Sequence, residues 1–134
     1  MQDFVDEEME PDPVLNEITN AIIGACIAVH RELGPAYGED IYEEALAMEM
    51  DARSINYSRQ HGIEVVYRNR VIGKGRLDFL VKGQVVVELK AVDQFAPVHT
   101  AQVLSYLKTT GCKLGLLINF RTKLLNEGIR RIAL

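Results

Sequence analysis

The sequence predicts an α/β (α+β) domain built on a mixed central β-sheet that is flanked by helices. Apolar residues recur at helical spacing over most of the first 53 residues and again over residues 98–110, whereas they alternate at every second position over residues 55–89. The resulting order of two helices, four strands, one helix and two strands fits a sheet packed between helices. The chain has 134 residues, of which 48% are hydrophobic and 25% are charged, as is ordinary for one globular domain.

The N-terminal third is predicted to be helical after a short arm. Residues 1–13 are acidic and end at two prolines, so we expect a flexible acidic arm there, followed by a single domain over residues 14–134. A long amphipathic helix is predicted over residues 14–33, ended by Gly34-Pro35, and a second helix over residues 39–53. The apolar positions that predict the first helix are Val14, Ile18, Ile22, Ala25 and Val29.

The rest of the chain is predicted to alternate between strands and one helix. A tight turn is expected at Lys82-Gly83-Gln84, and Pro97 closes a loop before the helix over residues 98–110. β-Branched residues predict strands over residues 55–59, 63–69, 71–81, 85–89, 113–120 and 128–133.

Charge is divided unevenly along the chain. The formal net charge is −4, but residues 1–53 carry 14 acidic and 2 basic side chains, whereas residues 54–134 carry 13 basic and 5 acidic ones. Such asymmetry points to a polyanionic ligand or to association between the unlike halves of two chains. An ordinary solvated surface is an equally good explanation.

Cysteine use and hydropathy favour a reduced, cytoplasmic protein that does not enter a membrane. Cys26 and Cys112 lie far apart, without a Cys-x-x-Cys pair, which argues against a disulfide scaffold and against a zinc ribbon. The acidic N-terminus lacks the apolar core of a signal peptide. No apolar run is expected to approach the roughly 18 residues that a membrane span needs.

The residues with the clearest chemistry lie on both sides of the predicted turn. Alternation along residues 85–90 places Glu88 and Lys90 on one face of the strand, and a turn centred on Gly83 places Asp78 opposite Glu88. Ionised side chains rarely occur in such apolar runs unless they are paired or bind a metal. Two carboxylates and a lysine are therefore expected to meet on one face of the sheet.

This set of side chains suits phosphodiester hydrolysis. Carboxylate oxygens bind Mg²⁺, or Mn²⁺ in its place, and the ion polarises a phosphate. A lysine can orient or deprotonate the attacking water and offset charge in the transition state. The alternative is a buried network of Asp78, Glu88 and Lys90 that only fixes the register of the hairpin.

The spacing from Asp78 to Glu88-Leu89-Lys90 resembles the signature of the PD-(D/E)XK nuclease superfamily, and the wider chain resembles its bacterial GxxExxY branch. The resemblance implies a restriction-endonuclease-like core and Mg²⁺-dependent cleavage of nucleic acid. Ala36 replaces the first glycine of the naming motif, which puts the geometry of that loop in question but not the fold. The branch resemblance is carried by residues 29–35, 39–46, 78–90 and 115–120.

The resemblance also implies site residues outside the hairpin. Glu39 matches a further catalytic and metal-binding carboxylate, and Tyr42 lies on the same helix face; the alternative for Glu39 is a first-turn residue that complements the helix dipole. Gln102 and Tyr106 resemble an accessory motif that contacts nucleic acid in the exonuclease branch, with polar residues on a partly buried helix as the alternative. His30 is expected at the site edge or bonded to a carbonyl, and His99 could join the face of Gln102.

Two functions stay open on the sequence. The first is a metal-dependent nuclease, and the second is a catalytically inactive module of the same fold that binds nucleic acid or mediates protein assembly. The complete set of Asp78, Glu88 and Lys90 favours the nuclease. The expected partner is nucleic acid, with DNA favoured over RNA, and a nuclease of this size that cuts both strands of a duplex would act as a homodimer.

Overall fold

A computed structural model describes residues 4–5 and 12–134. Its central sheet has six strands in the order β1-β6-β5-β4-β3-β2. Strands β4 and β5 are parallel and all the other neighbouring pairs are antiparallel, which confirms the predicted mixed sheet. The elements are β1 (Phe4–Val5), α1 (Pro13–Leu33), α2 (Glu39–Ala52), β2 (Tyr57–Tyr67), β3 (Arg70–Val81), β4 (Val85–Lys90), α3 (Pro97–Thr110), β5 (Leu114–Asn119), a 3₁₀ turn η1 (Leu125–Gly128) and β6 (Ile129–Ala133).

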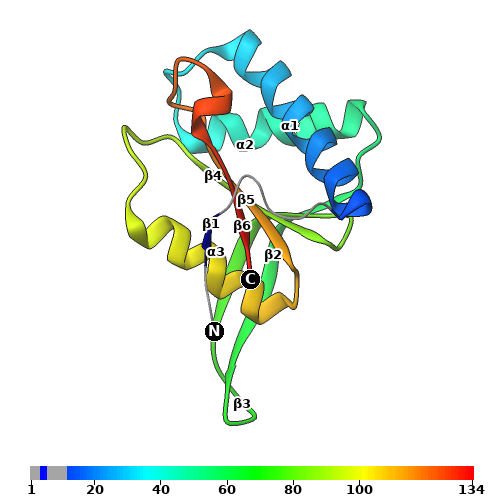
Figure 1. Ribbon diagram of the computed structural model, residues 1–134, viewed down its shortest axis with the longest axis vertical. Coiled ribbons are helices and arrows are strands. Elements are labelled where there is room, and N and C mark those ends of the chain that lie inside the picture. Colours follow the sequence, from blue (N-terminus) through cyan, green and yellow to red (C-terminus); the bar gives the residue numbers. More distant parts are fainter. Residues whose placement is uncertain (1–3, 6–11) are drawn as a thin grey trace.

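Helices cover both faces of the sheet (Figure 1). Helices α1 and α2 pack on one face through a core that includes Ile22, Leu46 and Phe79. Helix α3 packs on the other face, where Val103 and Leu107 contact residues of β4, β5 and β6. The sheet is therefore buried on both sides at β4 and β5, which explains why these two strands are apolar along most of their length.

Helix α1 begins and ends where its sequence signals place it. The Asp12 carboxylate accepts hydrogen bonds from the backbone N–H groups of Val14 and Leu15, at 2.9 and 3.1 Å, and Pro13 occupies the first turn. Gly34, with φ of 75°, ends the helix. By length and composition alone α1 could cross a membrane, so the expectation that no segment comes near that limit is wrong. Its most apolar side packs on the core, which accounts for this composition.

One difference from the predicted strands lies in β2. Residues 55–59 and 63–69 were expected to form two strands, but β2 is continuous from Tyr57 to Tyr67 and pairs with β3 along its length. Pairing continues on both sides of Gln60, at Arg59↔Phe79 and His61↔Leu77, although Gln60 itself takes a positive φ of 49°. A two-residue turn with positive φ at both positions, Arg68-Asn69, joins β2 to β3. A three-residue turn, Lys82-Gly83-Gln84, joins β3 to β4, with positive φ at Lys82 and Gly83.

Part of the predicted N-terminal arm pairs with the sheet. Backbone groups of Phe4 and Val5 lie opposite Ala133 and Ile132 of β6. The remaining arm residues, 1–3 and 6–11, lie outside the described residues.

A candidate metal centre on the β3–β4 hairpin

The turn at Lys82-Gly83-Gln84 sets the register of β3 against β4. Backbone pairing runs from Val81↔Val85 to Phe79↔Val87, so the next positions in this register are Asp78 and Glu88. At these two positions, hydrogen bonds from backbone N–H groups to carboxylate side chains take the place of backbone-to-backbone hydrogen bonds. The Asp78 N–H donates to Glu88 Oε1 at 3.0 Å, and the Leu89 N–H donates to Asp78 Oδ2 at 2.8 Å. Each carboxylate thus accepts a hydrogen bond from a backbone N–H group of the opposite strand.

Burial gives this carboxylate pair an unusual protonation. Glu88 is only 5% exposed. Its burial, and then the adjacent charge of Asp78, raise the pKa of Glu88 to about 8. Burial also raises the pKa of Asp78. The two carboxyls therefore share a proton near neutral pH unless a cation compensates for their charge.

Lys90 lies at the end of β4, two residues beyond Glu88, and is half-buried. Its charge lowers the pKa of both Asp78 and Glu88, although burial outweighs this influence. The Lys90 carbonyl accepts the Phe120 N–H at 2.9 Å, which ties the end of β4 to the segment after β5. The structure thus brings Asp78, Glu88 and Lys90 together.

Helix α2 presents Glu43, rather than Glu39, to this group. Glu39 lies in the exposed first turn of α2, one turn before Glu43. The charge of Glu43 raises the pKa of Asp78. Glu43 also accepts hydrogen bonds from Arg59 Nε at 2.8 Å and from Gln60 Nε2 at 2.7 Å.

Gln60 is distorted at the position opposite Asp78. Its neighbours on β2 pair as Arg59↔Phe79 and His61↔Leu77, which places Gln60 across from Asp78. A positive φ in a residue other than glycine is strained, and such strain is common at functional sites. Neither Glu43 nor Gln60 is among the residues predicted from the sequence. The available signal was weak: Glu43 is one turn from Glu39 on the same helix face.

Helix α3 adds two predicted residues to the site. Gln102 Nε2 donates to the Tyr106 hydroxyl at 3.0 Å. Burial, and then the charges of Glu88 and Asp78, raise the pKa of the Tyr106 phenol. The Tyr106 side chain therefore lies within the electrostatic reach of the carboxylate pair, and Gln102 extends this polar edge towards solvent.

Tyr42 and His30 hold the fold together at a different place. Tyr42 is fully buried, stacks on Phe120 with ring centroids 4.4 Å apart, and donates its hydroxyl proton to the Gly34 carbonyl. His30 Nε2 bonds the Thr122 carbonyl at 2.8 Å, the second of the two positions expected for it. His99 bonds the Ala96 N–H at 3.0 Å and closes the first turn of α3. These contacts fix the segments after α1, after β5 and before α3.

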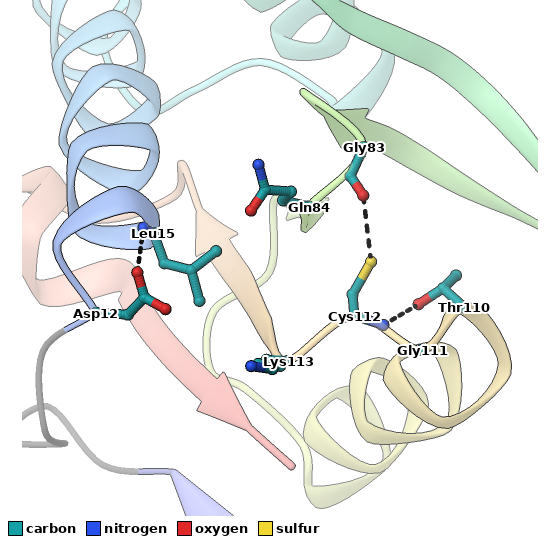
Figure 2. Close-up of a pocket in the computed structure, with 8 residues that line it drawn as sticks. All are labelled: Asp12, Leu15, Gly83, Gln84, Thr110, Gly111, Cys112 and Lys113. Atoms are coloured by element: carbon teal, nitrogen blue, oxygen red, sulfur yellow. Dashed lines mark hydrogen bonds between the residues drawn. The ribbon is translucent and has the colours of Figure 1, made fainter.

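The structure also has a small cavity at the opposite end of β4 (Figure 2). It measures about 220 Å³ and is lined by Asp12, Gln84, Cys112 and Lys113 among others. Ligand pockets usually measure about 300–1,000 Å³. The cavity adjoins the Gly83 turn, whereas Glu88 and Lys90 lie towards the other end of the strand. It is therefore separate from the carboxylate site.

A mixed sheet between helices, with paired carboxylates and a lysine on its central hairpin, defines a restriction-endonuclease-like domain. Residues 16–132 match the family model of the PD-(D/E)XK nuclease superfamily, and the chain belongs to that superfamily. No curated protein and no solved structure matches the chain.

Proposed function

We propose that this protein is a metal-dependent nuclease that hydrolyses phosphodiester bonds, with DNA as the substrate. The observation that carries the proposal is the buried pair of Asp78 and Glu88, held in register by each other's strands with Lys90 beside them. Membership of a nuclease superfamily supports it. The proposal includes the GxxExxY branch, because Glu39 and Tyr42 match its motif.

The donor set fits a hard divalent cation. Mg²⁺ is usually held by one or two carboxylates together with water and substrate phosphates, and Mn²⁺ accepts the same ligands. Asp78 and Glu88 would hold the ion, with the carboxylate of Glu43 or Glu39 behind them. When bound, the ion would polarise the scissile phosphate and favour deprotonation of a water. The raised pKa of Glu88 fits this role, since a cation would replace the shared proton.

The other side chains would act on the substrate directly. The Lys90 ammonium would orient the attacking water and offset negative charge on the phosphate. In its neutral amine form, Lys90 would accept a proton from that water. Gln102 and Tyr106 lie one turn apart on α3, where their polar groups would bind a neighbouring phosphate. Cys26 and Cys112 are free thiols, which fits the proposed cytoplasmic location.

The second candidate function is an inactive module of the same fold that binds nucleic acid or mediates assembly. One observation favours it: within residues 4–5 and 12–134, no three His, Cys, Asp or Glu side chains converge closely enough to hold a metal. Glu43 instead bonds Arg59 and Gln60.

Replacing Lys90 separates the two functions. With Mg²⁺ or Mn²⁺ at low salt, wild type should cut DNA, and Lys90→Ala should cut roughly 10²–10⁴-fold more slowly, as expected for a lost proton-transfer group. DNA affinity should change far less, because one contact is a small share of a multi-contact footprint.

Lys123→Ala is the matched control, since this exposed lysine lies in the segment before η1. Single-stranded and duplex DNA and RNA should all be tested. Wild type that binds these substrates but cuts none of them would establish the inactive module. Lys90→Ala that cuts at the wild-type rate would place the activity elsewhere.

A further inference from the structure

The β2–β3 hairpin extends well beyond the body of the domain (Figure 1). We define the hairpin arm as residues 64–76. All of these residues are exposed except Gly73 and Gly75, which are half-buried. Residues 70–76 of the arm belong to β3, the strand that also contains Asp78. At about 3.3 Å per residue, Arg70 lies about 25 Å along β3 from Asp78.

Most exposed side chains of the arm are of two kinds, large apolar and basic. Five are large and apolar, and the exposed fractions of Tyr67 and Ile72 reach 64% and 65%. Arg68, Arg70, Lys74 and Arg76 are basic, and Glu64 is the one acidic residue in this segment. Exposed apolar side chains on an edge hairpin favour aggregation unless a partner covers them. The arm therefore has the composition of a binding surface.

The base of the arm is fixed to the candidate site. Arg59, near the start of β2, forms ion pairs with Glu43 at 2.8 Å and Glu44 at 2.7 Å. On the other side, Gly75 lies beside the Tyr106 ring, where an added Cβ would be in ordinary contact with it at 4.0 Å. A ligand bound along the arm would thus be held in a set position relative to Asp78 and Glu88.

We propose that the hairpin arm enters the major groove of duplex DNA and holds the duplex against the carboxylate site. This inference rests on the proposed nuclease function and names its substrate as double-stranded DNA. A two-stranded ribbon fits the major groove of B-form DNA, which is about 12 Å wide. Arg70 and Lys74 contact phosphates beside the groove, and Tyr67 and Ile72 contact base edges and thymine methyl groups.

Charge complementarity favours DNA over a second copy of the chain. The cores of protein interfaces are depleted in charged residues, whereas basic residues lie directly beside apolar ones in the arm, as in Tyr67-Arg68 and Arg70-Val71. Duplex RNA fits less well, because the major groove of an A-form helix is too narrow for a ribbon. The register shift between Val65 and Val66 adds a bulge and increases the twist of the arm, which suits a helical groove.

The test measures binding of a DNA duplex of about 20 base pairs, about two helical turns, in EDTA so that no cleavage occurs. Arg70→Ala/Lys74→Ala should weaken binding about tenfold or more. It should also reduce the slope of log affinity against log salt by about 2, because two phosphate contacts are lost. Arg31→Ala/Lys123→Ala removes the same charge far from the arm and is the matched control. Equal losses in the two variants would overturn the inference.

Tyr67→Ser/Ile72→Ser tests entry into the groove. Duplex affinity should fall while the salt slope stays unchanged, since apolar contacts release no counterions. The variants should keep the wild-type melting temperature, because these positions are exposed. If duplex RNA of the same sequence binds as tightly as DNA, groove entry is wrong. If this variant instead dissociates a dimer in sedimentation and binds DNA normally, the arm is a self-association surface.

Cleavage of the same duplex with Mg²⁺ separates this inference from the proposed function. Arm-dependent binding without cleavage by wild type would overturn the nuclease and leave the DNA-binding arm. If both arm variants bind and cleave the duplex as wild type does, the nuclease function stands and the proposed role of the arm is wrong.

Discussion

At the scale of single residues, the structure shows how Asp78 can be replaced without breaking the hairpin. Asp78 Oδ2 accepts the Leu89 N–H at 2.8 Å, and an asparagine oxygen can accept the same bond. Asp78→Asn therefore removes the charge while keeping the backbone contact. It also removes the like charge beside Glu88, so the metal-free variant should be at least as stable as wild type.

Metal binding should depend on the Asp78 charge that Asp78→Asn removes. Mg²⁺ or Mn²⁺ should raise the melting temperature of wild type, because a ligand that binds only the folded state stabilises it. Asp78→Asn should show no such rise in a thermal-shift titration. The reference melting temperature of each protein is measured in EDTA, without divalent cations. Equal rises in the two proteins would locate the metal elsewhere.

Glu43 and Glu39 compete for the role of the carboxylate on α2. Of these two residues, Glu43 is the one whose charge influences the pKa of Asp78. Glu43→Gln should therefore reduce metal affinity and cleavage by roughly 10- to 100-fold, the usual effect of a group behind the metal ligands. Glu39→Gln should change both much less.

Glu44→Gln is the control for Glu43→Gln. It breaks the other ion pair of Arg59, at 2.7 Å, but Glu44 is not among the charges that influence the pKa of Asp78. Isothermal titration with Mn²⁺ gives the affinities. A larger loss in Glu39→Gln than in Glu43→Gln would favour the residue that the family resemblance implies.

At the scale of secondary-structure elements, the close approach of η1 to the end of β5 supports the loops around the site. A Cβ on Gly128 would overlap the Asn119 carbonyl oxygen. The Asn119 side chain, in turn, bonds both backbone groups of Val92, with its Nδ2 lying 2.7 Å from the Val92 carbonyl. The glycine is thus required by backbone packing next to the strand end that carries Lys90.

Gly128→Ala should lower the free energy of unfolding by about 1–3 kcal/mol, as is typical of overpacking. Gly62→Ala is the matched control, since nothing lies within 4 Å of the added Cβ there, and its effect should stay within about 0.5 kcal/mol. Urea unfolding measures both variants. Similar values for the two would show that η1 moves away freely from β5.

At the scale of the whole molecule, the buried carboxylates make stability depend on pH. The folded-state pKa of Glu88 is about 8, well above its ordinary value of 4.5, so the folded state binds a proton that the unfolded state has released. The contribution of this carboxyl to stability is complete below its ordinary pKa and is lost as pH rises through about 8.

Metal-free protein should therefore melt at a lower temperature at pH 9 than at pH 6. Glu88→Gln, which cannot ionise, should show a smaller decrease. Saturating Mn²⁺ should also reduce the decrease, because the ion binds the deprotonated pair. Scanning calorimetry in EDTA and in Mn²⁺ gives these values. A melting temperature that falls equally in wild type and Glu88→Gln would assign the pH dependence to other groups.

Much of the fold follows from local patterns in the sequence. The change from helical to alternating spacing predicts the order of helices and strands, since each period reflects which side of an element is buried. A three-residue turn at Lys82-Gly83-Gln84 is enough to place Asp78 opposite Glu88, because register in a hairpin follows from the turn. These features depend on residues close together in the chain.

Only the tertiary structure decides the features that join distant segments. The proximity of Glu43 to Asp78 depends on how α2 packs against the sheet, and the positive φ of Gln60 depends on its pairing with β3. The role of Tyr42 as a core residue depends on its stacking on Phe120. The sequence by itself therefore determined the elements and the central hairpin through local spacing, whereas long-range packing decided which further side chains surround the carboxylates and left the hairpin arm exposed.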